Sequence, residues 1–346
     1  MSANRKTAVV ICPGRGTYNK TELGYLGQHF PDADMLAKFD VQRSANNQET
    51  LSELDGAKRF SLAKHTRGDN ASGLIFAATL GDYRLINSDE IEIVAVTGNS
   101  MGWYSALACA GATTPENGFS IANTMGTLMQ DALIGGQLVY PFLGADWTPD
   151  LARRDKLLAL MRQIDAAPGH TLLPSIHLGG MLVLAGNEAG LKAFENTADP
   201  VDGRFPMRLG NHAAFHTPMQ QPVADKGRER LAVDLLQQPQ IPMVDGRGAI
   251  WWPHAADLHT LWDYTLGHQV TETYDFTRAV ETAAREFAPD LFIVTGPGTT
   301  LGGAVAQSLI LADWQGMNSK EAFKSLQAVD PVLISMGMAD QRSLVT

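Results

Sequence analysis

Cysteine is scarce in this sequence, which contains only Cys12 and Cys109 among 346 residues. Both lie in apolar segments, so we expect them to be reduced and buried, and two residues cannot form a metal cluster. Long apolar runs are also absent, and without a stretch of about 18 apolar residues no membrane span is expected. The start, MSANRKTAVVICPG, lacks the small-residue cleavage site of a signal peptide. Together these absences predict a cytoplasmic protein.

Positive charge is in short supply as well. Lysine and arginine number 27 against 37 acidic residues, which gives a net charge of −10. A nucleic-acid partner requires a basic face, so none is expected. Two short basic clusters, Arg153–Lys156 and Lys226–Arg230, are typical of solvated helix faces. No metal, nucleotide or flavin motif is present, so neither a metal nor a cofactor is expected.

Strand and helix patterns alternate along both flanks of the chain. Valine- and isoleucine-rich runs predict strands at 7–12, 91–96, 241–244 and 291–294. Helical spacing between them predicts a three-layer α/β domain with a parallel sheet. Residues 135–208 alternate strands with helices and predict a small α+β insert of ferredoxin-like shape. The large subdomain would then be 1–134 and 209–346, ending in a tail of some thirty residues without recognisable chemistry.

One turn in the sequence is a candidate reactive site. In VTGNSMGWYSALACAGA, residues 96–112, a strand meets Gly98-Asn99-Ser100-Met101-Gly102 and continues as a helix. This G-x-S-x-G pattern holds a serine clear of the sheet, at a helix N-terminus where developing negative charge is favoured. The pattern alone also fits a plain tight turn, so Ser100 is a candidate nucleophile on these grounds and no more.

A serine nucleophile requires a base and an oxyanion hole. Nine histidines are present, and His216, in NHAAFHTPM, follows an irregular loop where catalytic groups tend to lie. His212 is its competitor, and periodicity does not choose between them. The backbone N–H of Met101 is one candidate oxyanion donor, and the turn 14–16 could supply the other.

These segments resemble a known family. GNSMGWYSALACAGA is similar to the GHSxGEYSALxxAG block of malonyl-CoA:acyl-carrier-protein transacylases and polyketide-synthase acyltransferase domains. PGRGTY stands where that family has PGQGSQ, and AFHTPM resembles its histidine block. DFTRAV and VTGPGTTLGG match two further blocks in the same order. The resemblance covers nearly the whole chain and implies an α/β-hydrolase-like large subdomain with a ferredoxin-like small one.

The resemblance also implies a reaction and its residues. Ser100 would attack an acyl-CoA thioester with His216 as base, and the phosphopantetheine thiol of an acyl carrier protein would then accept the acyl group. Backbone N–H groups of Arg15 and Met101 would form the oxyanion hole. By alignment, the backbone carbonyl of Asp275 would orient the histidine. Acyl-CoA would be a substrate, and the pathway would be fatty acid or polyketide biosynthesis.

The sequence departs from the family where the acyl group is selected. Malonyl-using members carry an arginine twenty-five positions after the serine, and that position is Met125 here. A methionine offers no donor to a carboxylate, whose burial without a partner is costly. We therefore expect a neutral acyl group against a flexible Met125. The alternative is a true malonyltransferase in which Met125 is core and another cation, Arg15 or Arg67, binds the carboxylate.

Four further positions differ around the expected pocket. Asn99 replaces the histidine before the serine, and Trp103 replaces a glutamate and would narrow or stack against the entrance. Ser72 stands at a family glutamine, and His177 at a family asparagine. We expect all four to contact substrate, although a lone histidine such as His177 is more often structural.

Other functions remain open at this stage. An acyl hydrolase of the same fold would remove acyl groups from carrier proteins, and it differs only in whether water or a thiol resolves the acyl-serine. A non-catalytic docking protein would not need Ser100 or His216. An ordinary esterase would need an acid between these two residues in the chain. An acidic carrier protein would dock on a local basic patch, for which the two basic clusters are candidates.

Overall fold

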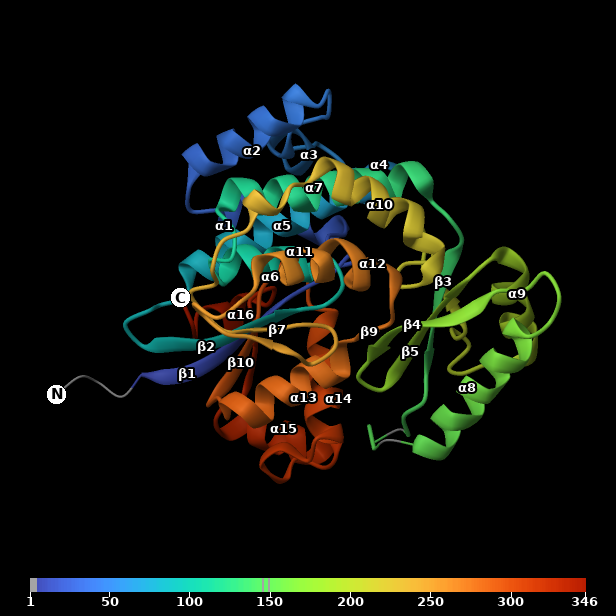
Figure 1. The fold of residues 1–346 in the computed structure, drawn as a ribbon. Coiled ribbons are helices and arrows are strands. Elements are labelled where there is room, and N and C mark those ends of the chain that lie inside the picture. Colours follow the sequence, from blue (N-terminus) through green and yellow to red (C-terminus); the bar gives the residue numbers. More distant parts are fainter. Residues whose placement is uncertain (1–4, 145, 149) are drawn as a thin grey trace.

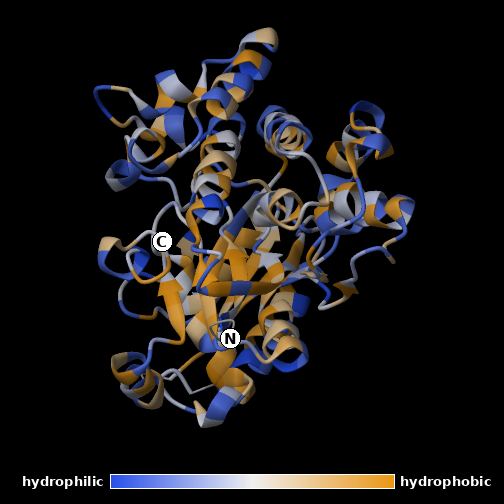
Figure 2. Ribbon diagram, turned by 90° about the vertical axis from the view of Figure 1, so that its left-hand side faces the viewer, coloured by the Kyte–Doolittle hydropathy of each residue, from blue (hydrophilic) through white to orange (hydrophobic). Residues whose placement is uncertain are grey.

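The computed structural model describes residues 5–144, 146–148 and 150–346. A six-stranded sheet runs through the centre, with hydrophobic residues concentrated in its strands (Figure 2). Its strands, in spatial order, are β11 (Leu333–Ser335), β10 (Leu291–Val294), β1 (Lys6–Cys12), β2 (Ile91–Gly98), β7 (Met243–Val244) and β8 (Ile250–Trp251). All neighbours are parallel except β7 and β8. The predicted parallel sheet is therefore present, with an added antiparallel edge.

The central strand β1 shows why helices cover both faces. Ala8, Val10 and Cys12 are fully buried in one hydrophobic cluster, while Val9 and Ile11 are fully buried in another. Because side chains alternate across a strand, these clusters lie on opposite faces of the sheet. The sheet is thus the middle of three layers, as the apolar run predicts.

Two sets of helices form the outer layers (Figure 1). The first face is covered directly by α5 (Gly68–Leu85), α6 (Gly102–Cys109) and α7 (Pro115–Ala132). Further helices lie on the same side of the sheet, namely α1 (Tyr25–His29), α2 (Ala33–Ala45), α3 (Leu51–Asp55), α4 (Leu62–His65), α10 (Gln221–Arg230), α11 (Leu258–Asp263), a π-helix (Tyr264–His268) and α12 (Gln269–Thr271). The second face carries α13 (Phe276–Phe287), α14 (Leu301–Leu311) and α15 (Lys320–Val329), and α16 (Ala339–Arg342) follows β11.

A second, five-stranded sheet lies beside the first (Figure 1, right). Residues 136–208 contribute β3 (Gly136–Pro141), α8 (Leu151–Asp165), β4 (Leu172–Leu178), β5 (Met181–Gly186), α9 (Glu188–Thr197) and β6 (Met207–Arg208). The elements follow in the order β-α-β-β-α-β, with strands arranged β6-β3-β5-β4, so β4 and β5 succeed one another where the sequence predicts an alternation of strands and helices. The strands and helices enclose their own core around Leu138, Leu184 and Phe194.

The fifth strand of this sheet comes from outside the predicted insert. β9 (Tyr274–Asp275) pairs in parallel with β4, which sets His177 opposite Asp275. α13 begins directly after β9 and packs on the main sheet, so β9 joins the two sheets. The sequence does not predict this strand, because two residues carry no periodicity.

Among the described residues, no helix is long and apolar enough to cross a bilayer. No group of three or more histidine, cysteine, aspartate or glutamate side chains in the same residues is arranged to hold a metal ion.

Candidate active site

Ser100 stands on a sharp turn at the carboxyl end of β2. Its φ is 55°, and α6 begins two residues later at Gly102. A Cβ on Gly98 would lie 2.3 Å from the backbone of Gly102, and a Cβ on Gly102 would lie 2.2 Å from the carbonyl oxygen of Cys12. Both distances are far below van der Waals contact, so the turn closes only because both positions are glycine.

His216 lies within hydrogen-bonding distance of the serine. Its Nε2 is 2.7 Å from the Ser100 Oγ, and its Nδ1 is 2.6 Å from the carbonyl oxygen of Gln269. A carbonyl only accepts, so Nδ1 carries the hydrogen and Nε2 is left to accept from the serine hydroxyl. The histidine backbone is held by a bond from its N–H to the carbonyl oxygen of Val270. This arrangement of nucleophile, base and orienting group is the one that activates a serine.

The environment keeps the imidazole neutral. His216 is only 2% exposed. Burial lowers its pKa from 6.5 to about 4, although the bond to the Gln269 carbonyl acts in the opposite direction. At neutral pH the ring therefore has a free lone pair, as a general base requires.

Gln269, rather than Asp275, orients the histidine, so the prediction for Asp275 is wrong. Asp275 lies in β9, where its carboxylate is 3.2 Å from the Nδ1 of His177. Gln269 begins α12 after the π-helix, and its side chain also donates to the Ser100 carbonyl oxygen and accepts from the Tyr104 hydroxyl. A backbone carbonyl leaves no trace in residue type, and the irregular helix before it defeats counting along the chain.

His212 does not compete for the serine. Its Nδ1 is bonded to the side-chain oxygen of Gln137 in β3, 2.8 Å away. Burial, with additional repulsion from Arg15 and His216, lowers its pKa to about 3. Of the two candidate histidines, only His216 is bonded to Ser100.

The backbone of Arg15 and Met101 lies at the same turn. Met101 follows the serine and is the N-cap residue of α6. Arg15 follows Gly14, where an added Cβ would be 2.6 Å from the carbonyl oxygen of Asn99. Both peptides therefore belong to the two segments that meet at Ser100, and their role as oxyanion donors stays a prediction.

The residues predicted to line the pocket lie in different places. Met125 is fully buried in α7, with its sulfur 2.8 Å from the Cβ position of Gly227 in α10. Ser72 is buried in α5 against Gly126 of α7. Asn99 is 9% exposed, and its side-chain oxygen lacks a protein partner. His177 and Asp275 line a cavity of about 360 Å³ beside the second sheet.

Trp103 does not narrow an entrance, so that prediction is wrong. The side chain is fully buried, and its indole N–H donates to the Thr265 hydroxyl at 3.0 Å. Its ring meets Tyr264 edge to face. The first turn of α6 points inward here, and the large aromatic ring anchors α6 to the π-helix that precedes Gln269.

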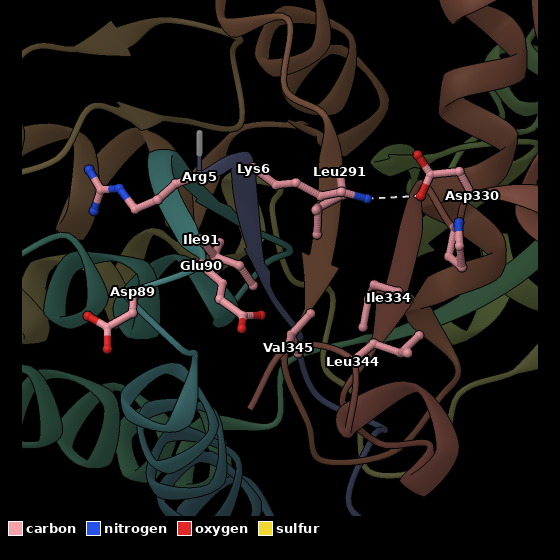
Figure 3. A pocket seen from close by; sticks show the side chains of 11 residues that line it. Arg5, Lys6, Asp89, Glu90, Ile91, Leu291, Asp330, Ile334, Leu344 and Val345 are labelled. Carbon is pink, nitrogen blue, oxygen red and sulfur yellow. Dashed lines mark hydrogen bonds and ion pairs between the residues drawn. The ribbon is translucent and has the colours of Figure 1, made fainter. Parts of the chain in front are cut away.

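Another cavity lies at the opposite end of the main sheet, where its central strands begin (Figure 3). Its volume is about 410 Å³, and Lys6, Ile91 and Leu291 line it where their strands begin. Lys6 is paired across it with Asp330, at 2.9 Å. Ligands of parallel α/β sheets bind at the carboxyl ends of strands, where Ser100 lies, so this cavity is separate from the candidate site.

Comparison with known proteins finds similarity to acyl carrier protein transacylases and to a polyketide synthase. No protein-family model matches the chain. It is 24% identical over 305 residues to the malonyl CoA-acyl carrier protein transacylase of Escherichia coli strain K12, covering 85% of this chain and 90% of that protein. The enzyme of the same name from Haemophilus influenzae is 23% identical over 336 residues, covering 95% and 100%. A non-reducing polyketide synthase of Cercospora beticola is 26% identical over 231 residues, which are 66% of this chain and 10% of that one.

Solved structures share the fold along almost the whole chain. The malonyl-CoA:acyl carrier protein transacylase of Xanthomonas oryzae pv. oryzae superposes with a TM-score of 0.74 at 18% identity, covering 99% of this chain and 98% of that one. The acyl-carrier-protein S-malonyltransferase of Burkholderia pseudomallei gives 0.73 at 21% identity, with 98% of each chain covered. At these identities the likeness establishes the two-sheet fold.

Proposed function

Since the chain belongs to the malonyl-CoA:acyl-carrier-protein transacylase family, we propose that it moves an acyl group from acyl-CoA to the phosphopantetheine thiol of an acyl carrier protein. The observation that carries this proposal is the hydrogen bond between Ser100 and a neutral His216. A carbonyl rather than a carboxylate orients the histidine. An ordinary esterase triad, which uses an acid at that position, therefore does not fit the site.

In the first half-reaction Ser100 becomes acylated. Its Oγ forms a bond to the thioester carbonyl carbon while its proton passes to Nε2 of His216. The backbone N–H groups of Arg15 and Met101 would bind the negative oxygen of the tetrahedral intermediate. The carbon–sulfur bond then breaks, and the departing CoA sulfur takes the proton from the imidazolium. Neutral His216 and an acyl-serine ester remain.

The second half-reaction reverses these steps with a different thiol. The phosphopantetheine thiol gives its proton to Nε2 of His216 and its sulfur attacks the ester carbon. The carbon–oxygen bond to Ser100 breaks, and the serine oxygen recovers the proton. Water in place of the thiol would make the protein an acyl hydrolase, which is the alternative that this step decides.

Two classes of acyl group fit the residues of the site. Met125, fully buried against α10, supports a neutral acyl chain, because methionine offers no donor to a carboxylate. The guanidinium of Arg15 supports an acyl group with a free carboxylate, as in a true malonyltransferase with a relocated arginine. Met125 alone therefore does not decide the acyl group.

Intact-protein mass spectrometry tests the proposal. Incubation with malonyl-, acetyl- and longer acyl-CoAs should add one acyl mass to the wild-type chain, and Ser100→Ala should gain none. His216→Ala should slow the gain by at least about a hundredfold, since general-base catalysis contributes 10²–10⁴-fold. If no acyl-CoA acylates the wild-type protein, or if Ser100→Ala is acylated equally, Ser100 is not the nucleophile.

A further inference from the structure

Arg15 carries a guanidinium whose hydrogen bonds are incomplete. Its Nη2 donates to the carbonyl oxygens of Thr66, at 3.0 Å, and Asn211, at 2.8 Å. Its Nε and Nη1 are buried and have no protein partner. A buried donor without an acceptor costs about 1–3 kcal/mol, and more when the group is charged. The arrangement is therefore unfavourable in the free protein unless something else accepts from these donors.

The charge of Arg15 also lacks a carboxylate partner among the described residues. The carboxylate of Asp69 acts to raise the pKa of Arg15, but it is engaged in a bidentate pair with Arg67. Burial lowers the pKa of Arg15 to about 10, so the side chain stays a cation at neutral pH. Its histidine neighbour, His212, is neutral there because its pKa is lowered to about 3. An anion placed beside Arg15 would thus meet one uncompensated positive charge.

The guanidinium lies between the two segments that form the candidate active site. Its backbone belongs to the turn packed on Asn99, the residue before the serine. Its charged end lies 5.3 Å from the ring centre of Phe215, the residue before the catalytic histidine. The side chain therefore spans from the serine turn to the histidine loop.

Nη1 of Arg15, one of the two donors without a partner, lies where α5 packs against α7. The Cβ position of Gly68, in the first turn of α5, is 3.3 Å from Nη1 of Arg15 and 2.8 Å from the carbonyl oxygen of Gly126. Gly126 follows the fully buried Met125 in α7. A pocket of about 280 Å³ opens beside Arg15, with Asn211 and His212 in its lining.

We infer that Arg15 is the specificity-determining residue, and that its guanidinium binds the free carboxylate of a dicarboxylic acyl group during acylation of Ser100. The inference rests on the proposed function and names its substrate class, the half-thioesters of short dicarboxylic acids with CoA. Carboxylate oxygens would accept from the buried donors and neutralise the charge. A neutral acyl group would leave both buried donors of Arg15, Nε and Nη1, without an acceptor. The cation that binds the carboxylate thus comes from the turn that carries the Arg15 backbone N–H, and not from α7.

Competition between two acyl-CoAs tests this inference. Wild-type protein is mixed with equal malonyl-CoA and acetyl-CoA, and the ratio of the two acyl masses on Ser100 is measured at early times. We expect malonyl to dominate. Arg15→Gln retains the backbone N–H and removes the cation, and it should lower the ratio by about 10- to 100-fold, the usual contribution of charged hydrogen bonds. Arg15→Lys, which keeps a cation, should recover part of the ratio.

Arg84→Gln is the matched control, because Arg84 is also an arginine, in the last turn of α5, but is half-exposed and paired with Asp32. It should leave the ratio unchanged. Wild-type loading by acetyl but not malonyl overturns the inference without any variant, and leaves the proposed function intact. Loading by neither also overturns the inference, and the proposed function itself fails only if the longer acyl-CoAs do not acylate Ser100 either. An unchanged ratio in a folded Arg15→Gln, checked by circular dichroism, also overturns the inference.

Discussion

Ser100 and His216 share an uncommon backbone conformation. Their φ angles are 55° and 56°, in the left-handed region that costs a non-glycine residue about 1 kcal/mol or more. Surrounding contacts hold both residues there, the two glycines around the serine and the Val270 carbonyl for the histidine. The strain aims Oγ at Nε2 before substrate arrives, so the pair is preorganised for proton transfer.

The pH dependence of acylation follows from the buried imidazole. The pKa of His216 is lowered to about 4, and the protonated ring cannot accept the serine proton. The rate of acylation should therefore be flat around neutral pH and fall about tenfold per unit only below pH 4. The rate of single-turnover acylation, followed by quenched mass spectrometry from pH 3.5 to 8, measures this pH dependence. An inflection near 6.5 would instead indicate an exposed histidine and contradict the geometry.

Residue types predicted that Ser100 and His216 would lie together, but not what surrounds them. The G-x-S-x-G turn and the AFHTPM segment indicated Ser100 and His216, because their chemistry lies in their side chains. Gln269 was missed, since its carbonyl does the orienting. Trp103 was misplaced, because sequence position does not show which way the first turn of a helix faces. The substrate roles of Met125, Asn99, Ser72 and His177 stay predictions.

The strand, turn and helix around Ser100 act as one element. Gly98→Ala would place a methyl 2.3 Å from the Gly102 backbone, which neither the strand nor the helix can relieve by a side-chain movement. We expect it to lower the free energy of unfolding by more than about 3 kcal/mol. Urea unfolding followed by circular dichroism measures this change.

Gly302→Ala is the matched control. Gly302 lies in α14, and a Cβ there would have no atom within 4 Å. Alanine favours a helix over glycine, so this variant should gain about 0.5–1 kcal/mol. Equal unfolding midpoints for Gly98→Ala and the wild type would refute the close packing at the turn.

Long, regular elements were predictable and short or irregular ones were not. The strands predicted at 7–12, 91–96 and 291–294 are present as Lys6–Cys12, Ile91–Gly98 and Leu291–Val294. In contrast, β9 and the π-helix depend on tertiary packing, and the sequence does not predict them.

The C-terminal segment packs against the core more closely than the sequence suggested. The supposed tail contributes β11 to the main sheet, and Arg342 pairs with fully buried Asp82 of α5. A strand of only three residues is too short for a recognisable hydrophobic pattern, so the sequence does not predict β11. The boundaries of the predicted subdomains at 134/135 and 208/209 stay predictions.

Docking of an acyl carrier protein would depend on how charge is distributed over the whole surface. The chain has a net charge of −10, so an acidic partner would need a local basic patch. Lys226 and Arg230 are exposed on α10, the first α-helix after the His216 loop. Arg153, in the other cluster, lies over the ring of Tyr140 in the second sheet. The cluster on α10 is therefore the better-placed candidate for docking.

The fate of the acyl-serine tests the central claim of acyl transfer most directly. Acylated wild-type protein is freed of CoA, divided, and mixed either with an acyl carrier protein carrying its phosphopantetheine or with buffer. Mass spectrometry then follows the acyl group on both chains. The account predicts that the acyl mass leaves Ser100 and appears on the carrier protein well before it is lost in buffer. Loss to water at the same rate in both mixtures, with no acylated carrier protein, would contradict transfer and identify a hydrolase.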